Sequence, residues 1–192
     1  MTSLRFGTHP TPVGTAVIAV TGEGLVVLEV TDAPPEYALE PAAHAVGAVP
    51  VHDPTAVEHI VRQLDEYFGG DRARFEVDID WRLVRGFPRA ALEAICDIPY
   101  GQTASYGEVA ISAGAPGAAR AVGTACARTP ICLVVPVHRV VRADGSLGEY
   151  GGRSDVKRFL VELERDAVGR IASGRPGGSR RDGSRRGERA GE

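Results

Sequence analysis

Cysteine is scarce in this 192-residue chain, and the three that occur, Cys96, Cys126 and Cys132, never stand in a Cys-x-x-Cys spacing. An odd and scattered set of thiols argues against a disulfide framework and against a zinc knuckle. We therefore expect three reduced thiols in the core. The histidines in the first 60 residues match no common metal-ligand spacing either, so the sequence predicts neither a metal site nor a cofactor.

Long apolar runs are also missing, since none approaches the roughly 18 residues that a membrane-spanning helix needs. The N-terminus lacks a basic stretch followed by an apolar one with a cleavage site. These absences lead us to expect a cytoplasmic protein with no membrane partner. The hydrophobic content of 43% is that of an ordinary globular chain, long enough for one good core or two small domains.

Charge is unevenly distributed along the chain. Residues 1–84 carry 5 basic and 13 acidic side chains, residues 85–164 carry 9 and 8, and residues 165–192 carry 8 arginines and 4 acids. Only the second and third segments can approach a polyanion without strong repulsion.

The first segment predicts a small α/β unit that contains no catalytic cluster. Its apolar residues alternate in some stretches and recur at helical spacing in another, with glycine or proline at the boundaries. The pattern predicts, in order, a hairpin at 15–21 and 25–30, no firm element at 31–52, a helix at 53–70 and a strand at 75–81.

Two short helices joined by a glycine-bearing turn dominate the second segment, after a helix that begins at Pro88. Ser105 and Glu108 form a capping box that opens the first of the two, and residues 118–128 make the second. Such a pair is a possible helix-turn-helix, although most helical hairpins of this kind are structural.

The second helix of this pair is nearly bare, because Arg120 and Arg128 are its only long side chains. A major-groove reader normally needs several polar side chains. A bare helix instead permits close approach to a backbone or a minor groove, with an arginine free to probe the base stack. Tight packing of the small residues on a core is the alternative, and both can hold on different faces.

The apolar run 131–135 predicts a short buried strand that leads into PVHRV at 136–140. A lone histidine after a strand is most often a packed or hydrogen-bonded structural residue. A glycine-rich loop at 148–152 precedes a helix at 155–165. From about Gly169 onward the chain has almost no apolar residues and predicts disorder. Its arginines either add salt-sensitive affinity for nucleic acid or keep the chain soluble.

Five blocks, in this order and spacing, resemble the O6-alkylguanine-DNA alkyltransferases and their alkyltransferase-like relatives. They are IPYGQTASYGEVA at 98–110, ARAVG at 119–123, PVHRVV at 136–141, GEYGG at 148–152 and the closing helix that ends in Glu164. The resemblance is strong from about Phe87 to Glu164, and over the first segment it rests on the order of elements alone.

The resemblance implies an α/β (α+β) protein of two domains. Residues 1–84 would form a ribonuclease-H-like α/β domain and residues 85–167 a winged helix-turn-helix-like DNA-binding domain. Residues 168–192 remain as a disordered tail rich in arginine and glycine.

The resemblance also implies roles for individual residues in contact with double-stranded DNA. Tyr106 would press on the phosphate beside the target nucleotide, and Arg120 would enter the stack that a flipped guanine leaves. His138 and Glu164 would form the outer members of a cysteine-water-histidine-glutamate relay. The further DNA-contacting positions are Ala121, Gly123, Arg128 and Thr129. The lesion pocket would be shaped by Pro136, Val137, Tyr150, Gly151 and Gly152.

Two positions depart from the family pattern. The acceptor cysteine falls on Val137 and the hinge asparagine on Thr129. An isopropyl group has no lone pair that could take an alkyl group, so we expect no self-alkylation at Val137. Cys126 or Cys132 could substitute only if the pocket were rearranged.

The sequence therefore predicts a monomeric protein that binds O6-alkylguanine in DNA, flips the base and leaves its removal to another pathway, for example through a nucleotide-excision-repair protein. Two alternatives remain. The chain could be a suicidal O6-methylguanine-DNA methyltransferase whose acceptor cysteine is replaced, or a scaffold that merely retains the fold.

Overall fold

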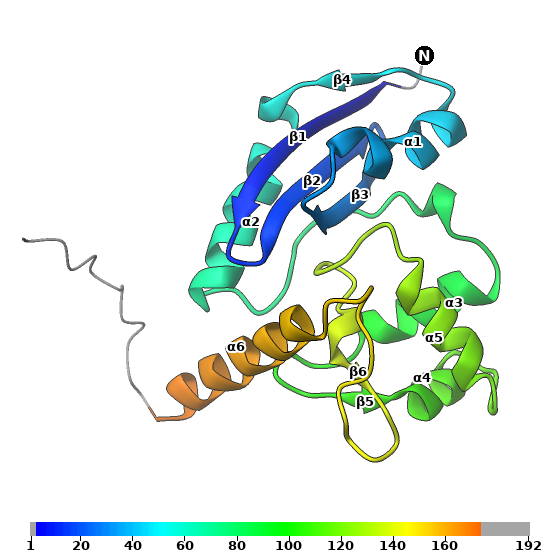
Figure 1. The fold of residues 1–192 in the computed structure, drawn as a ribbon, viewed down its shortest axis with the longest axis vertical. Coiled ribbons are helices and arrows are strands. Elements are labelled where there is room, and N and C mark those ends of the chain that lie inside the picture. The colour runs from blue at the N-terminus through cyan, green and yellow to red at the C-terminus, as the bar shows by residue number, and fades with distance from the viewer. Residues whose placement is uncertain (1–2, 174–192) are drawn as a thin grey trace, which may run out of the picture.

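The computed structural model describes residues 3–173, which form an N-terminal sheet unit followed by a helical unit (Figure 1). The sheet unit contains β1 (Leu4–Thr11), β2 (Gly14–Thr21), β3 (Gly24–Thr31), α1 (Pro35–Val46), β4 (Pro50–His52), η1 (Pro54–Val57), α2 (Glu58–Gly69) and η2 (Trp81–Leu83). The helical unit contains α3 (Phe87–Cys96), β5 (Ala104–Ser105), α4 (Tyr106–Ser112), α5 (Ala119–Ala127), η3 (Val137–Arg139), β6 (Val140–Val141) and α6 (Ser154–Ala172).

The sheet has the strand order β3-β2-β1-β4, antiparallel except for the β1–β4 pair. The predicted hairpin is confirmed as β2 and β3. Because successive side chains of a strand point to opposite faces, Val17 and Ala19 of β2 pack under α1. Ile18 and Val20 face the other way and join the core that α2 and the helical unit share. One face of the sheet is thus an interface between the two units.

The prediction for residues 31–52 was wrong, because this stretch contains α1 and β4. Pro35 and Pro41 and several alanines obscure the helical period of α1, whose buried face is only Ala38, Leu39 and Ala42. The N-terminal strand β1 was not predicted at all.

The strand predicted at 75–81 is also wrong. Ile79 forms only an isolated bridge with Leu25, through Leu25 N–H donating to Asp78 O and Asp80 N–H donating to Leu25 O, both at 2.8 Å. The Asp80 carboxylate then accepts from Arg82 N–H and opens the short helix η2. This cap turns the chain away from the sheet before a ladder can form.

The helix predictions of the second unit hold. Pro88 stands at the start of α3, and the Ser105–Glu108 capping box opens α4. The strand predicted at 131–135 is wrong: Leu133 has a left-handed φ of 68°, which breaks the extended run. Its backbone bonds instead tie it to β3, with Leu28 N–H donating to Pro130 O and Cys132 N–H to Leu28 O, both at 2.8 Å. The run is buried between the units.

Helix α6 extends beyond its predicted end and passes through Gly169, where we had predicted the disordered tail to begin. Ala167 is buried beside Gly70 of the sheet unit, and this contact supports the added turns. The rest of the predicted tail, residues 174–192, lies outside the described residues. Within residues 3–173, α6 and the other helices are all too short or too polar to cross a membrane.

Candidate functional site

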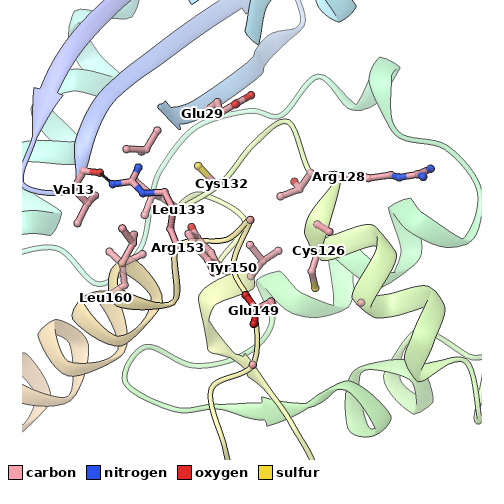
Figure 2. Close-up of a pocket in the computed structure, with 18 of the residues that line it drawn as sticks. Val13, Glu29, Cys126, Arg128, Cys132, Leu133, Glu149, Tyr150, Arg153 and Leu160 are labelled. Atoms are coloured by element: carbon pink, nitrogen blue, oxygen red, sulfur yellow. Dashed lines mark hydrogen bonds between the residues drawn. The ribbon is translucent and has the colours of Figure 1, made fainter. Parts of the chain in front are cut away.

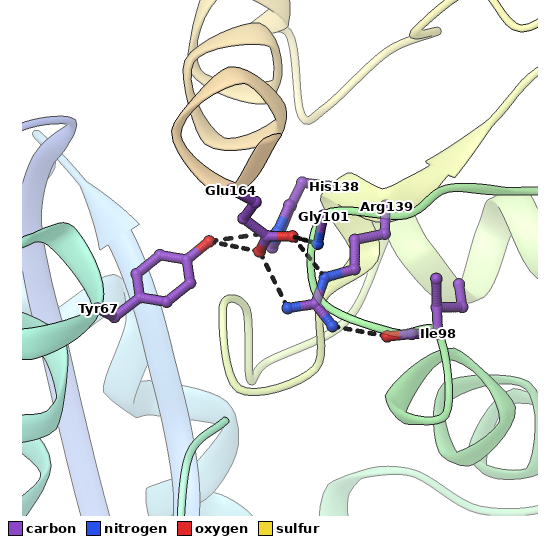
Figure 3. A network of polar contacts seen from close by, with 6 residues as sticks. All are labelled: Tyr67, Ile98, Gly101, His138, Arg139 and Glu164. Carbon is purple, nitrogen blue, oxygen red and sulfur yellow. Dashed lines mark hydrogen bonds and ion pairs between the residues drawn. The ribbon is translucent and has the colours of Figure 1, made fainter. Parts of the chain in front are cut away.

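The carboxylate of Glu164 is the centre of a buried polar network that joins both units (Figure 3). His138 Nε2 lies 2.8 Å from Oε1, and the Arg139 guanidinium donates to both oxygens, each at 2.9 Å. Tyr67 of α2 donates its hydroxyl to Oε1 at 2.8 Å. Gly101 N–H donates to Oε2 at 2.9 Å. One carboxylate thus accepts five hydrogen bonds from segments far apart in the sequence.

The electrostatics of this network define the state of His138. Burial alone would raise the pKa of Glu164, but the hydrogen bonds from His138 and Arg139 hold it at about 2, so the carboxylate is ionised and can only accept. Burial lowers the pKa of His138, with Glu164 opposing this, so the imidazole is neutral near pH 7. Its Nε2 must therefore carry the proton that Glu164 accepts.

The other ring nitrogen, His138 Nδ1, is then an acceptor. It is buried and has no hydrogen-bond partner within residues 3–173. A neutral imidazole oriented by a carboxylate, with its second nitrogen unprotonated, is arranged to take a proton from a neighbouring group. The neighbour in the chain is Val137, whose side chain has none to give.

Two members of the network, Arg139 and Tyr67, were missed by sequence reasoning. Arg139 stands next to His138 in the quoted motif, but an arginine is normally exposed, and nothing in the sequence indicated its burial. Its Nη1 also donates to Ile98 O at 2.7 Å. Tyr67 falls within the helix predicted at 53–70, and no local pattern could show that its hydroxyl meets a residue 97 positions later.

A cavity of about 610 Å³ lies beside this network, between the two units (Figure 2). Val137, only 4% exposed, forms part of its wall. Of the other residues predicted for the lesion pocket, Tyr150 and Gly151 line the cavity, whereas Pro136 and Gly152 are not among its lining residues. The structure therefore brings Val137 and the glycine-rich loop together around one space.

The residues predicted to contact DNA divide into two groups. Some line the same cavity, and these are Tyr106, Gly123, Arg128 and Thr129. The others, Arg120 and Ala121, are exposed on α5 outside it. In Figure 2 the guanidinium of Arg128 points away from the cavity.

The Tyr106 ring lies against Lys157, the only lysine of the chain. The ammonium group lies 5.9 Å from the centre of the Tyr106 ring and donates to Val140 O at 2.6 Å. Gly123 faces the same ring. Lys157 is fully buried, and sequence reasoning missed it, because its position on α6 indicates no partner.

Two thiols line the cavity, Cys126 and Cys132. Burial raises the pKa of Cys126 to about 12 and that of Cys132 to about 11. The Cys132 S–H group also donates a hydrogen bond to Leu28 O at 3.0 Å. Both are protonated near pH 7 and are therefore weak nucleophiles. Cys96 is exposed on α3, so the prediction of three core thiols was wrong for this residue.

Comparisons with known proteins agree on one family. Residues 86–166 match the model of the 6-O-methylguanine DNA methyltransferase DNA-binding domain. The chain is 41% identical over 157 residues to a methylated-DNA–protein-cysteine methyltransferase of Mycobacterium leprae, covering 82% of this chain and 90% of that protein. An inducible enzyme of the same name from Bacillus subtilis is 36% identical over 151 residues, or 78% and 84% of the two chains.

Solved structures give the same result. The O6-methylguanine methyltransferase of Mycobacterium tuberculosis superposes with a TM-score of 0.71 at 39% identity, covering 87% of this chain and 94% of that one. The same protein in complex with DNA gives 0.72 at 38% identity, with coverage of 86% and 94%. The chain belongs to the O6-methylguanine-DNA methyltransferase family.

Within this methyltransferase-family chain, the matched residues 86–166 include α3, α4, α5 and most of α6. They contribute His138, Arg139 and Glu164 to the buried network. Tyr67 comes from outside the matched region, as does the part of the cavity wall that the sheet supplies. The family domain therefore does not complete its site without the N-terminal unit.

Proposed function

We propose that the protein binds duplex DNA that contains O6-alkylguanine and turns the altered base into the cavity beside Val137. It does not accept the alkyl group at that position. The observation that carries this proposal is the placement of Val137, buried in the cavity wall directly before the oriented His138. An isopropyl group has no lone pair for an alkyl carbon, so the histidine has no nucleophile to activate there.

The DNA-binding part of the proposal is supported by the family domain at 86–166 and by the surface of α5. Ala121 and Ala127 are exposed on this helix, as is Arg120, so a nucleic-acid backbone can approach closely while the guanidinium reaches into the stack. The relative from M. tuberculosis has been solved in complex with DNA.

A second candidate function is alkyl transfer to another thiol, which the position of Cys126 and Cys132 in the same cavity favours. Their raised pKa values oppose it, because the thiolate is the reactive form. Binding without transfer is the better-supported function.

A lesion that is bound and not repaired must be removed by another activity. We propose as the partner a nucleotide-excision-repair protein that binds the complex between this protein and the flipped base. We propose a monomer that acts in the cytoplasm.

Two measurements test the proposal. In a gel-shift titration, the protein is expected to bind an O6-methylguanine duplex about tenfold more tightly than its unmodified twin, because a weakly paired base is easier to extrude. Equal affinity for the two duplexes would contradict the claim that the protein recognises the lesion. Mass spectrometry after incubation with the methylated duplex should show no methyl gain. A methyl group on Cys126 or Cys132 would instead establish the second candidate.

A further inference from the structure

The polar network around Glu164 contains one side chain of the N-terminal unit, Tyr67 of α2. Its hydroxyl donates to Glu164 Oε1 at 2.8 Å and lies 3.3 Å from His138 Nε2. Figure 3 shows this hydroxyl reaching the carboxylate from a different side than Arg139. Within residues 3–173, no other side chain of the N-terminal unit forms a hydrogen bond to Glu164.

The Tyr67 ring is held in place by other aromatic rings. It packs against Phe68 and Phe75, each with ring centres 5.4 Å away, and against the edge of Tyr100 at 6.2 Å. The side chain is only 1% exposed. Burial raises the pKa of Tyr67 well above its ordinary value, so the phenol keeps its proton and acts as a donor. The hydroxyl is therefore a fixed donor aimed at the carboxylate.

Tyr67 and His138 share one acceptor atom. Glu164 Oε1 accepts from the Tyr67 hydroxyl, from His138 Nε2 at 2.8 Å and from Arg139 Nη2 at 2.9 Å. Each donor offsets part of the negative charge on this oxygen, so each one weakens the attraction that the oxygen exerts on the other two. The Tyr67 hydroxyl thus lowers the pull of Glu164 on the Nε2 proton.

This pull affects the chemistry of the other ring nitrogen. A carboxylate that accepts from one nitrogen of an imidazole fixes the tautomer and the ring orientation, and makes the second nitrogen more basic. The charged side chains that act on the pKa of His138 are Glu164, Arg139 and Lys157, and all three belong to the helical unit. Tyr67 supplies the contact from the N-terminal unit.

We propose that Tyr67 is a positioning residue for His138. By sharing Oε1 of Glu164, its hydroxyl holds the carboxylate in place and moderates the attraction between the carboxylate and the imidazole. The N-terminal unit thereby sets how readily His138 Nδ1 takes up a proton. This inference goes beyond the proposed function, because it concerns the free protein and requires no DNA.

Nuclear magnetic resonance of the protein with ¹⁵N-labelled histidine tests the arrangement in the wild type. Buried N–H and O–H protons exchange slowly with water, so His138 should show an imidazole N–H resonance at Nε2, assigned by its loss in His138→Asn. This proton and the Tyr67 hydroxyl proton both point at Oε1, so a cross-relaxation peak should connect them.

Tyr67→Phe keeps the ring and removes the hydroxyl. Oε1 then has one donor fewer, so the remaining bond from Nε2–H becomes stronger and its proton resonance should move downfield. The matched control is Tyr100→Phe, which removes a buried hydroxyl from the same aromatic cluster. That hydroxyl has no hydrogen-bond partner within residues 3–173, so the Nε2–H resonance should keep its wild-type position.

The direction of the shift distinguishes positioning from packing. If Tyr67 only fills space, its truncation loosens the site, and the Nε2–H resonance moves upfield, stays unchanged or disappears through faster exchange. Any of these results, or an equal downfield shift in Tyr100→Phe, overturns the inference. Absence of the cross-relaxation peak in the wild type overturns it as well, and that measurement remains decisive if Tyr67→Phe does not fold.

Discussion

Residues 137 and 138 are neighbours in the chain but belong to two contrasting regions. His138 lies in a polar network in which Glu164 accepts five hydrogen bonds. Val137 has an apolar side chain and lines the cavity. His138 has the geometry to receive a proton, and the Val137 side chain has none to release. The structural role of His138 can therefore be separated from any chemical role.

The Glu164 network contributes to the fold even if it takes part in no reaction. The Glu164 carboxylate connects α6 to Arg139, to the turn at Gly101 and, through Tyr67, to the N-terminal unit. Buried charges are tolerated only when paired and hydrogen-bonded. His138 and Glu164 therefore stabilise the arrangement of the two units whether or not residue 137 reacts.

The largest expected effect comes from placing a cysteine nucleophile at residue 137. Val137→Cys should accept one methyl group per protein from an O6-methylguanine duplex, because the new thiol would stand in the cavity wall directly before His138, whose unprotonated Nδ1 has no partner within residues 3–173. Mass spectrometry of the intact protein measures the gain. The control Val135→Cys, buried two residues earlier and not lining the cavity, should remain unmethylated.

If Val137→Cys folds but stays unmethylated, the missing cysteine is not the only obstacle to alkyl transfer. Another feature of the pocket then prevents the reaction, and Thr129, at the family's hinge position, is the first residue to test.

The next effect concerns the polar region. Glu164→Gln removes the charge that compensates the buried Arg139, and should lower the free energy of unfolding by about 3–5 kcal/mol. Urea denaturation measures it. The control Glu162→Gln, exposed on the same helix, should stay within about 0.5 kcal/mol of wild type. A loss for Glu164→Gln no larger than that of the control would show that the network does not stabilise the fold.

A smaller effect is expected at the exposed surface of α5. Arg120→Ala should weaken binding to the O6-methylguanine duplex about tenfold, because in the proposed binding mode its guanidinium enters the space that the flipped base leaves. The melting temperature should not change, since the side chain is exposed. Arg165→Ala, exposed on α6, is the control for lost charge. Unchanged affinity of Arg120→Ala would mean that this side chain does not support base flipping.

The smallest effect is a pH dependence of stability. The pKa of His138 is lowered by burial, so the unfolded chain binds this proton first as the pH falls. Stability should therefore decrease as the pH falls below about 7.5, where the histidine of the unfolded chain begins to take up its proton. The Glu164 pKa of about 2 adds a further loss below about pH 5, where the unfolded carboxyl is protonated.

Urea titrations across this range measure the pH dependence. His138→Asn keeps a donor for Glu164 and should flatten the upper part of the curve. An unaltered curve in this variant would show that His138 is not the titrating group.

The sequence was informative where a local rule governs the backbone. The Ser105–Glu108 capping box and the Gly22–Gly24 turn were predicted because each depends on neighbouring residues only. It misled at 75–81, whose apolar residues are half-buried, and at 131–135, where Ile131, Leu133 and Val135 are buried, because neither stretch pairs in a ladder. It also left α1 unrecognised, because proline and alanine weaken its period.

In the candidate site, too, some features follow from the sequence and others only from the packing of the two units. The motif blocks, the family resemblance and the identity of Val137 were all available in the sequence, and they led to the proposal that alkyl transfer does not occur at residue 137. Only the tertiary structure decided that Tyr67 and Arg139 complete the Glu164 network and that β3 closes the cavity. The physical reason is that hydrogen bonds and apolar contacts between residues about 100 positions apart depend on how the two units pack, and no local pattern encodes that packing.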